Sequence, residues 1–374
     1  MRLLDRYLLR ELLVPLGYCL SGFLLLWVSA DLINELGSLQ EKKLHLGDIA
    51  EFYLVQTPAF LVLGLPVGLL LALLYTLTNH ARHNEITAIR AAGVSLWRLC
   101  LPYLGVGLLA SLAVLALNEW FIPDSSDHLD RIKTRRLPPT SDAPGRDKVF
   151  LAFTNERGGR SWTIPVYDLK TSEMQNPLVL MTQKDGSRLW LKADRAARID
   201  GVWTFYNARE YKEAAQADQP PVPLLRTNVL AQPEFTETPE QIRSEFTISA
   251  MMDTLSLRGT KKADIPIAAI LNYLKLHPWP AQPALLYTKL HGRLATPWTC
   301  LVVVLIAIPF GAPSGRRNVF VGVASSIVIF FAYFVLQQFC LALGSGGHVP
   351  AWLAGWFPNL AFGLAGLWMT LRVR

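Results

Sequence analysis

The chain has 374 residues, of which 51% are hydrophobic and only 17% are charged, and its formal net charge is +7. Soluble domains carry about 25% charged residues, so this composition argues against a soluble globular protein and favours a membrane protein. A positive charge can indicate nucleic-acid binding, but no basic patch interleaved with aromatic residues suits base stacking. No nucleic-acid partner is therefore expected.

Six apolar runs are each long enough to cross a bilayer as a helix, for which about 20 residues are needed. They are Leu12–Ile33, Phe52–Thr78, Leu99–Phe121, Leu294–Phe310, Val319–Leu343 and Trp352–Leu371. The arginines that flank these runs fall on one side of a six-span protein: Arg2, Arg6, Arg10, Arg82, Arg90, Arg98, Arg316, Arg317, Arg372 and Arg374. The positive-inside rule then predicts that both termini are cytoplasmic.

The first run has an alternative interpretation as a cleaved signal peptide, because Arg2, Arg6 and Arg10 precede it and it ends in Val28–Ala30. Acidic residues interrupt that basic segment, however, and the run is long for a signal core. A first membrane span is favoured.

A polar segment between the second and third runs has the periodicity of a helix. Ile86, Ile89 and Gly93 recur at spacings of three to four residues, with Glu85 and Arg90 beside them. The sequence predicts an amphipathic helix at about residues 82–98, within a first membrane region of residues 1–122. Such a helix can lie against a partner at the membrane surface.

A large polar insertion separates the third and fourth runs and lies on the opposite side of the membrane from the termini. It contains short alternating segments bounded by turn residues, as in an antiparallel sandwich or jelly roll. The segments are Lys148–Phe153, Trp162–Tyr167, Leu178–Thr182, Arg188–Ala193, Val202–Tyr206 and Leu224–Leu230. We expect an all-β, jellyroll-like domain at 123–262, a linking amphipathic helix at 263–282, and the last three spans at 283–374.

Four stretches together resemble the LptF/LptG permeases of the lipopolysaccharide export ABC transporter. They are Leu4–Glu11, Asn84–Gly93, Asn118–Trp120 and Trp352–Leu360. The resemblance covers nearly the whole chain, and the ending Leu367–Met369 is slightly more LptG-like. It implies a permease that extracts lipopolysaccharide from the outer leaflet of the inner membrane and passes it to a periplasmic bridge.

The resemblance also implies a set of partners. No G-x-x-x-x-G-K-[ST] phosphate loop occurs in the sequence, so a separate LptB-like ATPase dimer would supply the work and this chain would not be an enzyme. A homologous permease half, a single-span LptC-like protein and an LptA-like periplasmic bridge complete the expected assembly. No cofactor or metal is expected, since the four cysteines fit no zinc site.

The same resemblance assigns the amphipathic helix as the coupling helix that docks in a groove of the ATPase. Glu85 would bond to an arginine of the partner, because a charge-assisted bond is directional and strong. Around it, the expected coupling residues are Asn84, Ile86, Ile89, Arg90, Ala92 and Gly93.

Lipopolysaccharide presents phosphates, so its carrier needs basic groups at the level of the outer leaflet. Lys289 and Arg293 are four residues apart and can share one helix face. Gln337 and Gln338 of the fifth span could line the cavity, although interhelical hydrogen bonding is the favoured role for them. Lys42 and Lys43 are a weaker pair. The alternative role for Lys289 and Arg293 is that of snorkelling interface anchors.

Two other classes of function stay open from the sequence. An intramembrane hydrolase would need paired catalytic groups, and Glu119, His291 and His348 show no recognisable nucleophile–base spacing. A mechanotransmission subunit would share the coupling helix and the exported domain without moving lipid. Lipid crosslinking distinguishes it from a permease.

Overall fold

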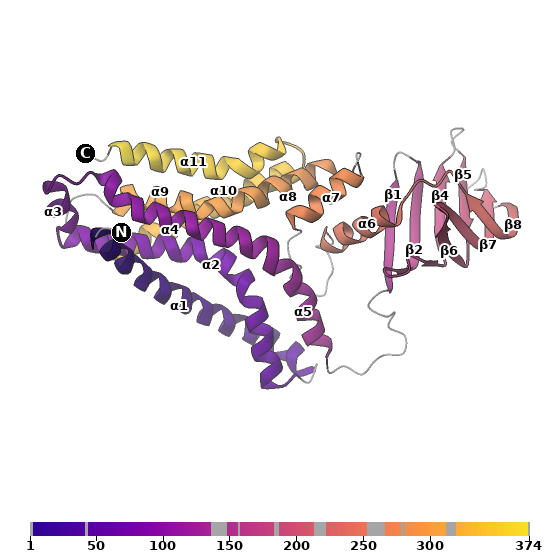
Figure 1. The fold of residues 1–374 in the computed structure, drawn as a ribbon, viewed down its shortest axis with the longest axis horizontal. Helices are drawn as coiled ribbons and strands as arrows, with labels where there is room; N and C mark the ends of the chain where they lie inside the picture. The colour runs from indigo at the N-terminus through magenta and orange to yellow at the C-terminus, as the bar shows by residue number, and fades with distance from the viewer. Residues whose placement is uncertain are drawn as a thin grey trace. The chain divides into compact units, whose positions relative to one another are not determined.

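The computed structural model describes residues 3–41, 44–135, 148–155, 158–182, 187–212, 222–252, 266–277, 280, 282–311 and 319–372. The chain divides into two compact units (Figure 1). The helical unit comprises residues 1–137, 262–267 and 284–374, and the β unit comprises residues 138–261 and 268–283.

The helical unit forms helices over all six predicted spans. Its elements are α1 (Leu3–Glu41), α2 (Leu46–Arg82), α3 (Glu85–Ala91), α4 (Leu96–Ala116), the π-helical η1 (Leu117–Phe121), α5 (Ile122–Thr134), α8 (Pro283–Ala295), the 3-10 turn η2 (Thr296–Trp298), α9 (Thr299–Gly311), α10 (Val319–Ser345) and α11 (Ala351–Arg372). Among the described residues, five helical stretches are long and apolar enough to cross a membrane, α8 to α9 counting as one. The less apolar α11 has 22 residues. At 1.5 Å per residue it reaches about 33 Å, which matches the hydrocarbon core.

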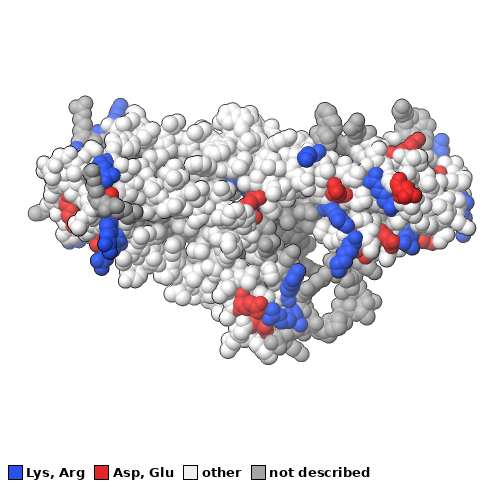
Figure 2. All heavy atoms as spheres, viewed as in Figure 1, with Lys and Arg blue, Asp and Glu red and all other residues white. Residues whose placement is uncertain are grey.

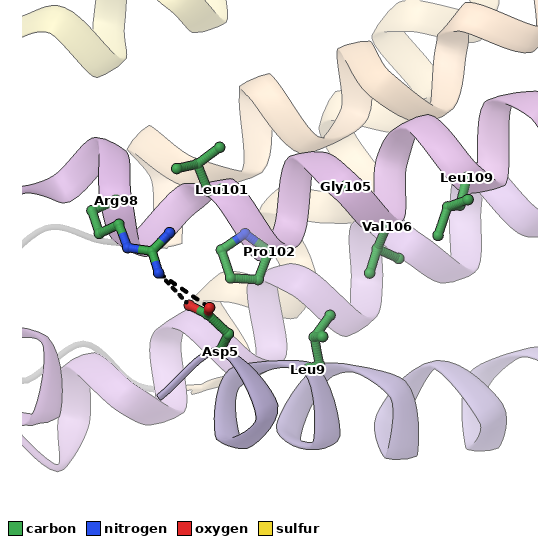
Figure 3. A pocket seen from close by; sticks show the side chains of 8 residues that line it. All are labelled: Asp5, Leu9, Arg98, Leu101, Pro102, Gly105, Val106 and Leu109. Atoms are coloured by element: carbon green, nitrogen blue, oxygen red, sulfur yellow. Dashed lines mark hydrogen bonds and ion pairs between the residues drawn. The ribbon is translucent and has the colours of Figure 1, made fainter. Parts of the chain in front are cut away.

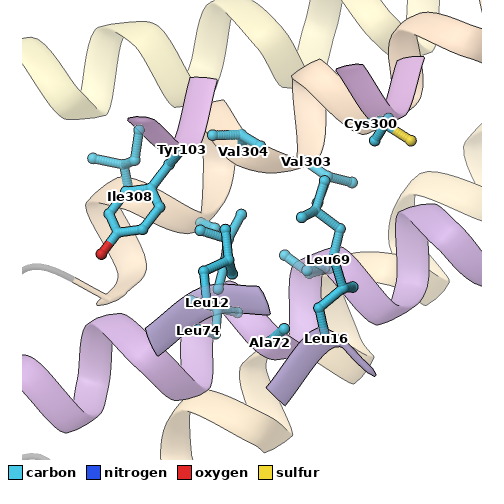
Figure 4. Close-up of a cluster of buried hydrophobic side chains, with 14 of the residues drawn as sticks. Leu12, Leu16, Leu69, Ala72, Leu74, Tyr103, Cys300, Val303, Val304 and Ile308 are labelled. Atoms are coloured by element: carbon cyan, nitrogen blue, oxygen red, sulfur yellow. The ribbon is translucent and has the colours of Figure 1, made fainter. Parts of the chain in front are cut away.

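The core of the helical unit brings together spans from both ends of the sequence. Leu12 of α1, Leu69 of α2, Tyr103 of α4 and Val304 of α9 are fully buried in one cluster (Figure 4). Glycines bring α11 close to the same bundle: a Cβ at Gly366 would lie 2.8 Å from the backbone of Leu305. Such close approach is how small residues pack helices in membranes, where water does not drive association. The expected α-helical membrane protein is confirmed.

The β unit is an antiparallel meander. Its strands are β1 (Lys148–Asn155), β2 (Arg160–Asp168), β3 (Met174–Gln175), β4 (Leu178–Thr182), β5 (Arg188–Lys192), β6 (Arg195–Ile199), β7 (Val202–Lys212) and β8 (Val222–Gln232). β3 and β4 follow one another along the same side of β2, and each pairs with a different part of it. In the same way, β5 and β6 pair with different parts of β7. Asn176, between β3 and β4, and Asn207, within β7 opposite the break between β5 and β6, adopt positive φ angles of 53°. The expected inserted β domain is confirmed.

One face of this sheet is lined by large apolar side chains. Trp162, Trp203 and Phe205 are at most 1% exposed and pack around Phe235. The Glu237 carboxylate accepts from Arg160 Nε at 2.9 Å and lies beside these rings. Two helices complete the unit, α6 (Pro239–Met252) and α7 (Ile267–Leu276). The burial alternates along β2 and β7, as expected for a sheet with one face covered.

Candidate functional site

The short helix α3 lies between α2 and α4 and has a left-handed residue at each end. Asn84 precedes it with φ 57°, and Gly93 follows it with φ 85°. Asparagine and glycine tolerate this region of backbone space better than other residues. The helix expected at residues 82–98 is therefore shorter: α3 has seven residues, Glu85–Ala91. The left-handed conformations of Asn84 and Gly93 end the helical path on either side of it, and α4 begins only at Leu96.

The Glu85 carboxylate is held from two sides by its own chain. Its Oε2 accepts from Tyr7 Oη of α1 at 3.0 Å and lies 2.7 Å from His80 Nδ1 of α2. The His80 side chain is 3% exposed, whereas that of Glu85 is 34% exposed. Glu85 is thus fixed in direction while part of its carboxylate still faces outward.

The apolar side chains of α3 face the bundle. Ile86 is buried against Ala81, and Ile89 packs against the main core. The Ile86 side chain is covered by the chain's own residues, and its docking role stays a prediction. The surface that α3 exposes consists of Thr87, Ala88, Arg90, Ala91 and Ala92, followed by exposed Gly93.

A second contact ties the other end of this segment to α1. Arg98 Nη2 of α4 donates to both carboxylate oxygens of Asp5, at 3.1 and 3.2 Å. Together with the Tyr7–Glu85 bond, it connects the first turns of α1 to both sides of α3. Sequence reasoning missed Tyr7 and Asp5, because the pairs of α1 with α3 and α4 are separated by 78 and 93 residues. It also missed His80, which is only five residues from Glu85 and could have been found from that spacing.

Lysine and arginine side chains gather at the end of the helical unit where α3 lies (Figure 2). The beginning of α1 and the end of α11 are drawn at the same end of the helical unit as α3 in Figure 1. The described arginines that precede or follow spans there are Arg6, Arg10, Arg82, Arg90, Arg98 and Arg372. Arg2, Arg316, Arg317, Arg374, Lys42 and Lys43 lie outside the described residues.

The two predicted lipid contacts, Lys289 and Arg293, line one pocket between α8 and α10. The pocket has a volume of about 380 Å³ and also holds Gln338, Thr288 and Ser345 among its polar residues. Lys289 and Arg293 are both half-buried. The structure therefore brings together two cations, an amide and the three hydroxyls of Thr288, Thr296 and Ser345 beside apolar walls. This donor set suits phosphate groups attached to acyl chains.

The irregular helix η1 fixes the position of Arg293. In a π-helix the hydrogen bonds shift by one residue, which changes the partners of the local carbonyl groups. The Asn118 carbonyl of η1 accepts from Arg293 Nη2 at 3.2 Å. This contact joins α8 to the third span, next to the pocket.

The acidic residues near the end of α1 belong to an ion-pair network. Glu35 pairs with Lys133 of α5 at 3.1 Å, and Asp48 and Glu51 of α2 pair with Arg135 at 3.1 and 2.8 Å. These acids therefore serve contacts between helices at the end of the unit opposite to α3. Among the described residues, no group of three or more His, Cys, Asp or Glu could hold a metal ion.

The fold and these sites define a class of protein: a multi-pass α-helical membrane protein with an inserted β unit, an exposed short helix between two spans, and a basic pocket between two others. The chain matches the family of lipopolysaccharide export system permeases LptF/LptG over residues 6–372. It belongs to that family, and is accordingly a multi-pass protein of the inner membrane with a role in lipopolysaccharide export. A search of curated proteins finds no match.

Proposed function

We propose that the chain is one permease half of an ABC transporter that extracts lipopolysaccharide from the outer leaflet of the inner membrane. A separate LptB-like ATPase dimer drives it, and a homologous half completes the membrane cavity. The observation that carries this proposal is the pocket between α8 and α10. Lys289 and Arg293 line it together with apolar residues, in a chain that belongs to this family.

The distribution of basic residues supports an orientation for the chain. Arg6, Arg10, Arg90 and Arg98 lie at the α3 end of the helical unit, and the positive-inside rule favours that end in the cytoplasm. The β unit would then be periplasmic. The Lys289–Arg293 pocket would then face the outer leaflet, where the positive-inside rule does not call for basic residues. This placement favours a role of the two side chains in binding anionic groups.

The contacts of α3 support its role as the coupling helix. Its exposed face presents Arg90 and small residues, which allow a partner backbone to approach closely, and Glu85 is held at the rim. We propose that Asn84, Glu85, Arg90, Ala92 and Gly93 contact the ATPase. Ile89 supports them from beneath through its contact with the core.

The edges of the β unit support its role in a periplasmic bridge. Within the described sheet β8 pairs only with β7, and β1 only with β2. Val222, Leu224 and Val229 of β8 are each more than half exposed. An edge strand with free backbone groups and exposed apolar side chains can pair with a strand of another chain. LptC-like and LptA-like partners would continue the sheet here.

Crosslinking tests the proposal against its alternative, a mechanotransmission subunit that moves no lipid. A photoreactive residue in place of Gln338, inside the pocket, should crosslink lipopolysaccharide in the assembled complex, and ATP should reduce the yield. The matched position is Leu364 of α11, which is 63% exposed and outside the pocket. Absence of a crosslink at 338 in an ATP-hydrolysing complex would contradict the permease role and favour mechanotransmission.

A further inference from the structure

A groove between α1 and α4 has a charged pair at one end and apolar walls along the rest. It has a volume of about 300 Å³. Asp5 and Arg98 form the charged end, and the walls are Leu9, Leu101, Pro102, Gly105, Val106 and Leu109 (Figure 3). This volume is at the lower limit of ligand pockets, which are about 300–1,000 Å³. The groove is separate from the Lys289–Arg293 pocket.

The length of the groove matches one leaflet. Arg98 and Leu109 are both on α4, and at 1.5 Å per residue they are separated by about 16 Å along the helix axis. Half of the hydrocarbon core is about 15 Å. A partner helix would need contacts along the whole bilayer thickness, whereas an acyl chain anchored by its head group ends at the midplane. The dimensions therefore favour a lipid.

The charge at the open end favours an anionic head group. Among the described residues, the Arg98 guanidinium engages Asp5 through Nη2 alone, so other donors of the group face outward, and the side chain is 37% exposed. Arg6 and Arg10 are exposed on α1 and form no ion pair with a described residue. They share a depression with Leu9, which also lines the groove. Three arginines and one acid thus lie in the first turns of α1 and α4.

Gly105 keeps the groove open at half its length. A Cβ built on it would meet no atom within 4 Å, and the residue is exposed. A larger side chain at this position would therefore occupy the groove without a clash with the bundle. A Cβ built on Gly17 of α1 would likewise meet no atom within 4 Å, and Gly17 is exposed. Gly17 does not line the groove, so a larger side chain there would leave the groove open.

We propose that this groove binds an anionic phospholipid of the leaflet at the basic end of the bundle. Its phosphate contacts Arg98, with Arg6 and Arg10 beside it, and one acyl chain lies along Leu101 to Leu109. Basic pockets between spans on the cytoplasmic side are a known type of head-group site. This lipid is distinct from the exported one and would set the position of α1 against α4.

The test uses the full chain in phosphatidylcholine nanodiscs with a trace of photoreactive lipid that carries a diazirine in its acyl chain. The phosphatidylglycerol probe should label the peptide containing residues 101–109 at least about fivefold more than the phosphatidylcholine probe. This ratio corresponds to about 1 kcal/mol per basic group near the surface. No ATPase or lipopolysaccharide is present, so the result is independent of the proposed transport function.

Three variants make the outcome decisive. Gly105→Phe should lower labelling by both probes, and Gly17→Phe should leave it unchanged. Arg6→Gln combined with Arg10→Gln changes only exposed side chains and should lower the preference for phosphatidylglycerol. Equal labelling by the two probes, or wild-type labelling of Gly105→Phe, would overturn the proposal. So would crosslinking of the groove to another protein in place of lipid when the assembled complex is used.

Discussion

At the scale of the residue, Glu85 has two roles that its position makes compatible. One carboxylate oxygen is engaged by Tyr7 and His80, and the side chain remains 34% exposed. A carboxylate that is already oriented loses less side-chain entropy when it binds an arginine of a partner. The internal contacts therefore favour the docking that we propose for Glu85.

A second carboxyl group, in the β unit, is buried among polar groups of α6 and α7. Glu245 Oε1 accepts from Tyr273 Oη at 3.0 Å and lies 3.4 Å from His277 Nδ1. Burial raises the pKa of Glu245 to about 7, although the bond from Tyr273 opposes the shift. Burial lowers the pKa of His277. The α6–α7 contact is therefore sensitive to pH.

The sign of this sensitivity follows from proton binding. The folded state binds the Glu245 proton more tightly than the unfolded state, so its contribution to the free energy of unfolding is lost as pH rises through about 7. His277 acts oppositely, but only below its unfolded pKa of about 6.5. Between pH 6.5 and 8 we expect exchange of the α6 and α7 amides, corrected for intrinsic rates, to become faster. The loss between pH 6.5 and 8 is about 1 kcal/mol, because most of the contribution of Glu245 is already lost between its unfolded pKa and pH 6.5.

Glu245→Gln keeps an acceptor for Tyr273 and removes the ionisation, so this pH dependence should become flat. The matched variant is Glu240→Gln, which changes an exposed carboxylate of α6. Hydrogen exchange with mass spectrometry on the full chain measures both. The same pH dependence in the two variants would show that Glu245 is not the responsible group.

At the scale of the element, the stability of α3 depends on the left-handed residues that flank it, Asn84 and Gly93. Gly93→Ala places a Cβ on a residue with φ 85°, which costs about 1–2 kcal/mol. We expect at least about fivefold more frequent local opening of α3, seen as faster exchange of its amides. Gly17→Ala is the control, because Gly17 is helical and a Cβ there meets no atom within 4 Å. Unchanged exchange of α3 in Gly93→Ala would contradict this account.

Local pattern predicted most elements but not how they are interrupted. The six spans and the six strand segments follow from hydrophobic runs and alternation, and their helices and strands are observed. β3 and β6 were missed because each is a short continuation beyond a break, and Met174–Gln175 has no pattern of its own. The seven-residue length of α3 depends on backbone conformations at Asn84 and Gly93 that periodicity does not report.

The candidate sites were predictable to different degrees. Lys289 and Arg293 could be paired from their spacing on one helix, and Gln338 could be named from its place in the fifth span, whereas the structure adds Thr288, Thr296 and Ser345. The burial of Ile86 against Ala81 could not be predicted, because an amphipathic stripe does not reveal whether its apolar side faces a partner or the chain's own bundle. Tyr7 and Asp5 depend on tertiary contacts.

At the scale of the whole helical unit, α1 connects the end that contains α3 with the end that contains α5. Its first turns contact α3 and α4 through Tyr7 and Asp5, and Glu35 near its other end pairs with Lys133 of α5. α1 is one helix of 39 residues, which is about 58 Å long. A displacement of α3 could therefore be passed along one continuous helix to the helix that precedes the β unit.

The most direct test of coupling is ATP-dependent release of lipopolysaccharide from vesicles by the complex reconstituted with its ATPase. Glu85→Ala should abolish release while the chain still inserts in the membrane. Tyr7→Phe should lower release about fivefold, since a bond to a charged group at a half-exposed site is worth about 1 kcal/mol. Glu41→Ala, which changes an exposed carboxylate at the far end of α1, should release at the wild-type rate. Wild-type release by Glu85→Ala would contradict the central claim that α3 couples the ATPase to this chain.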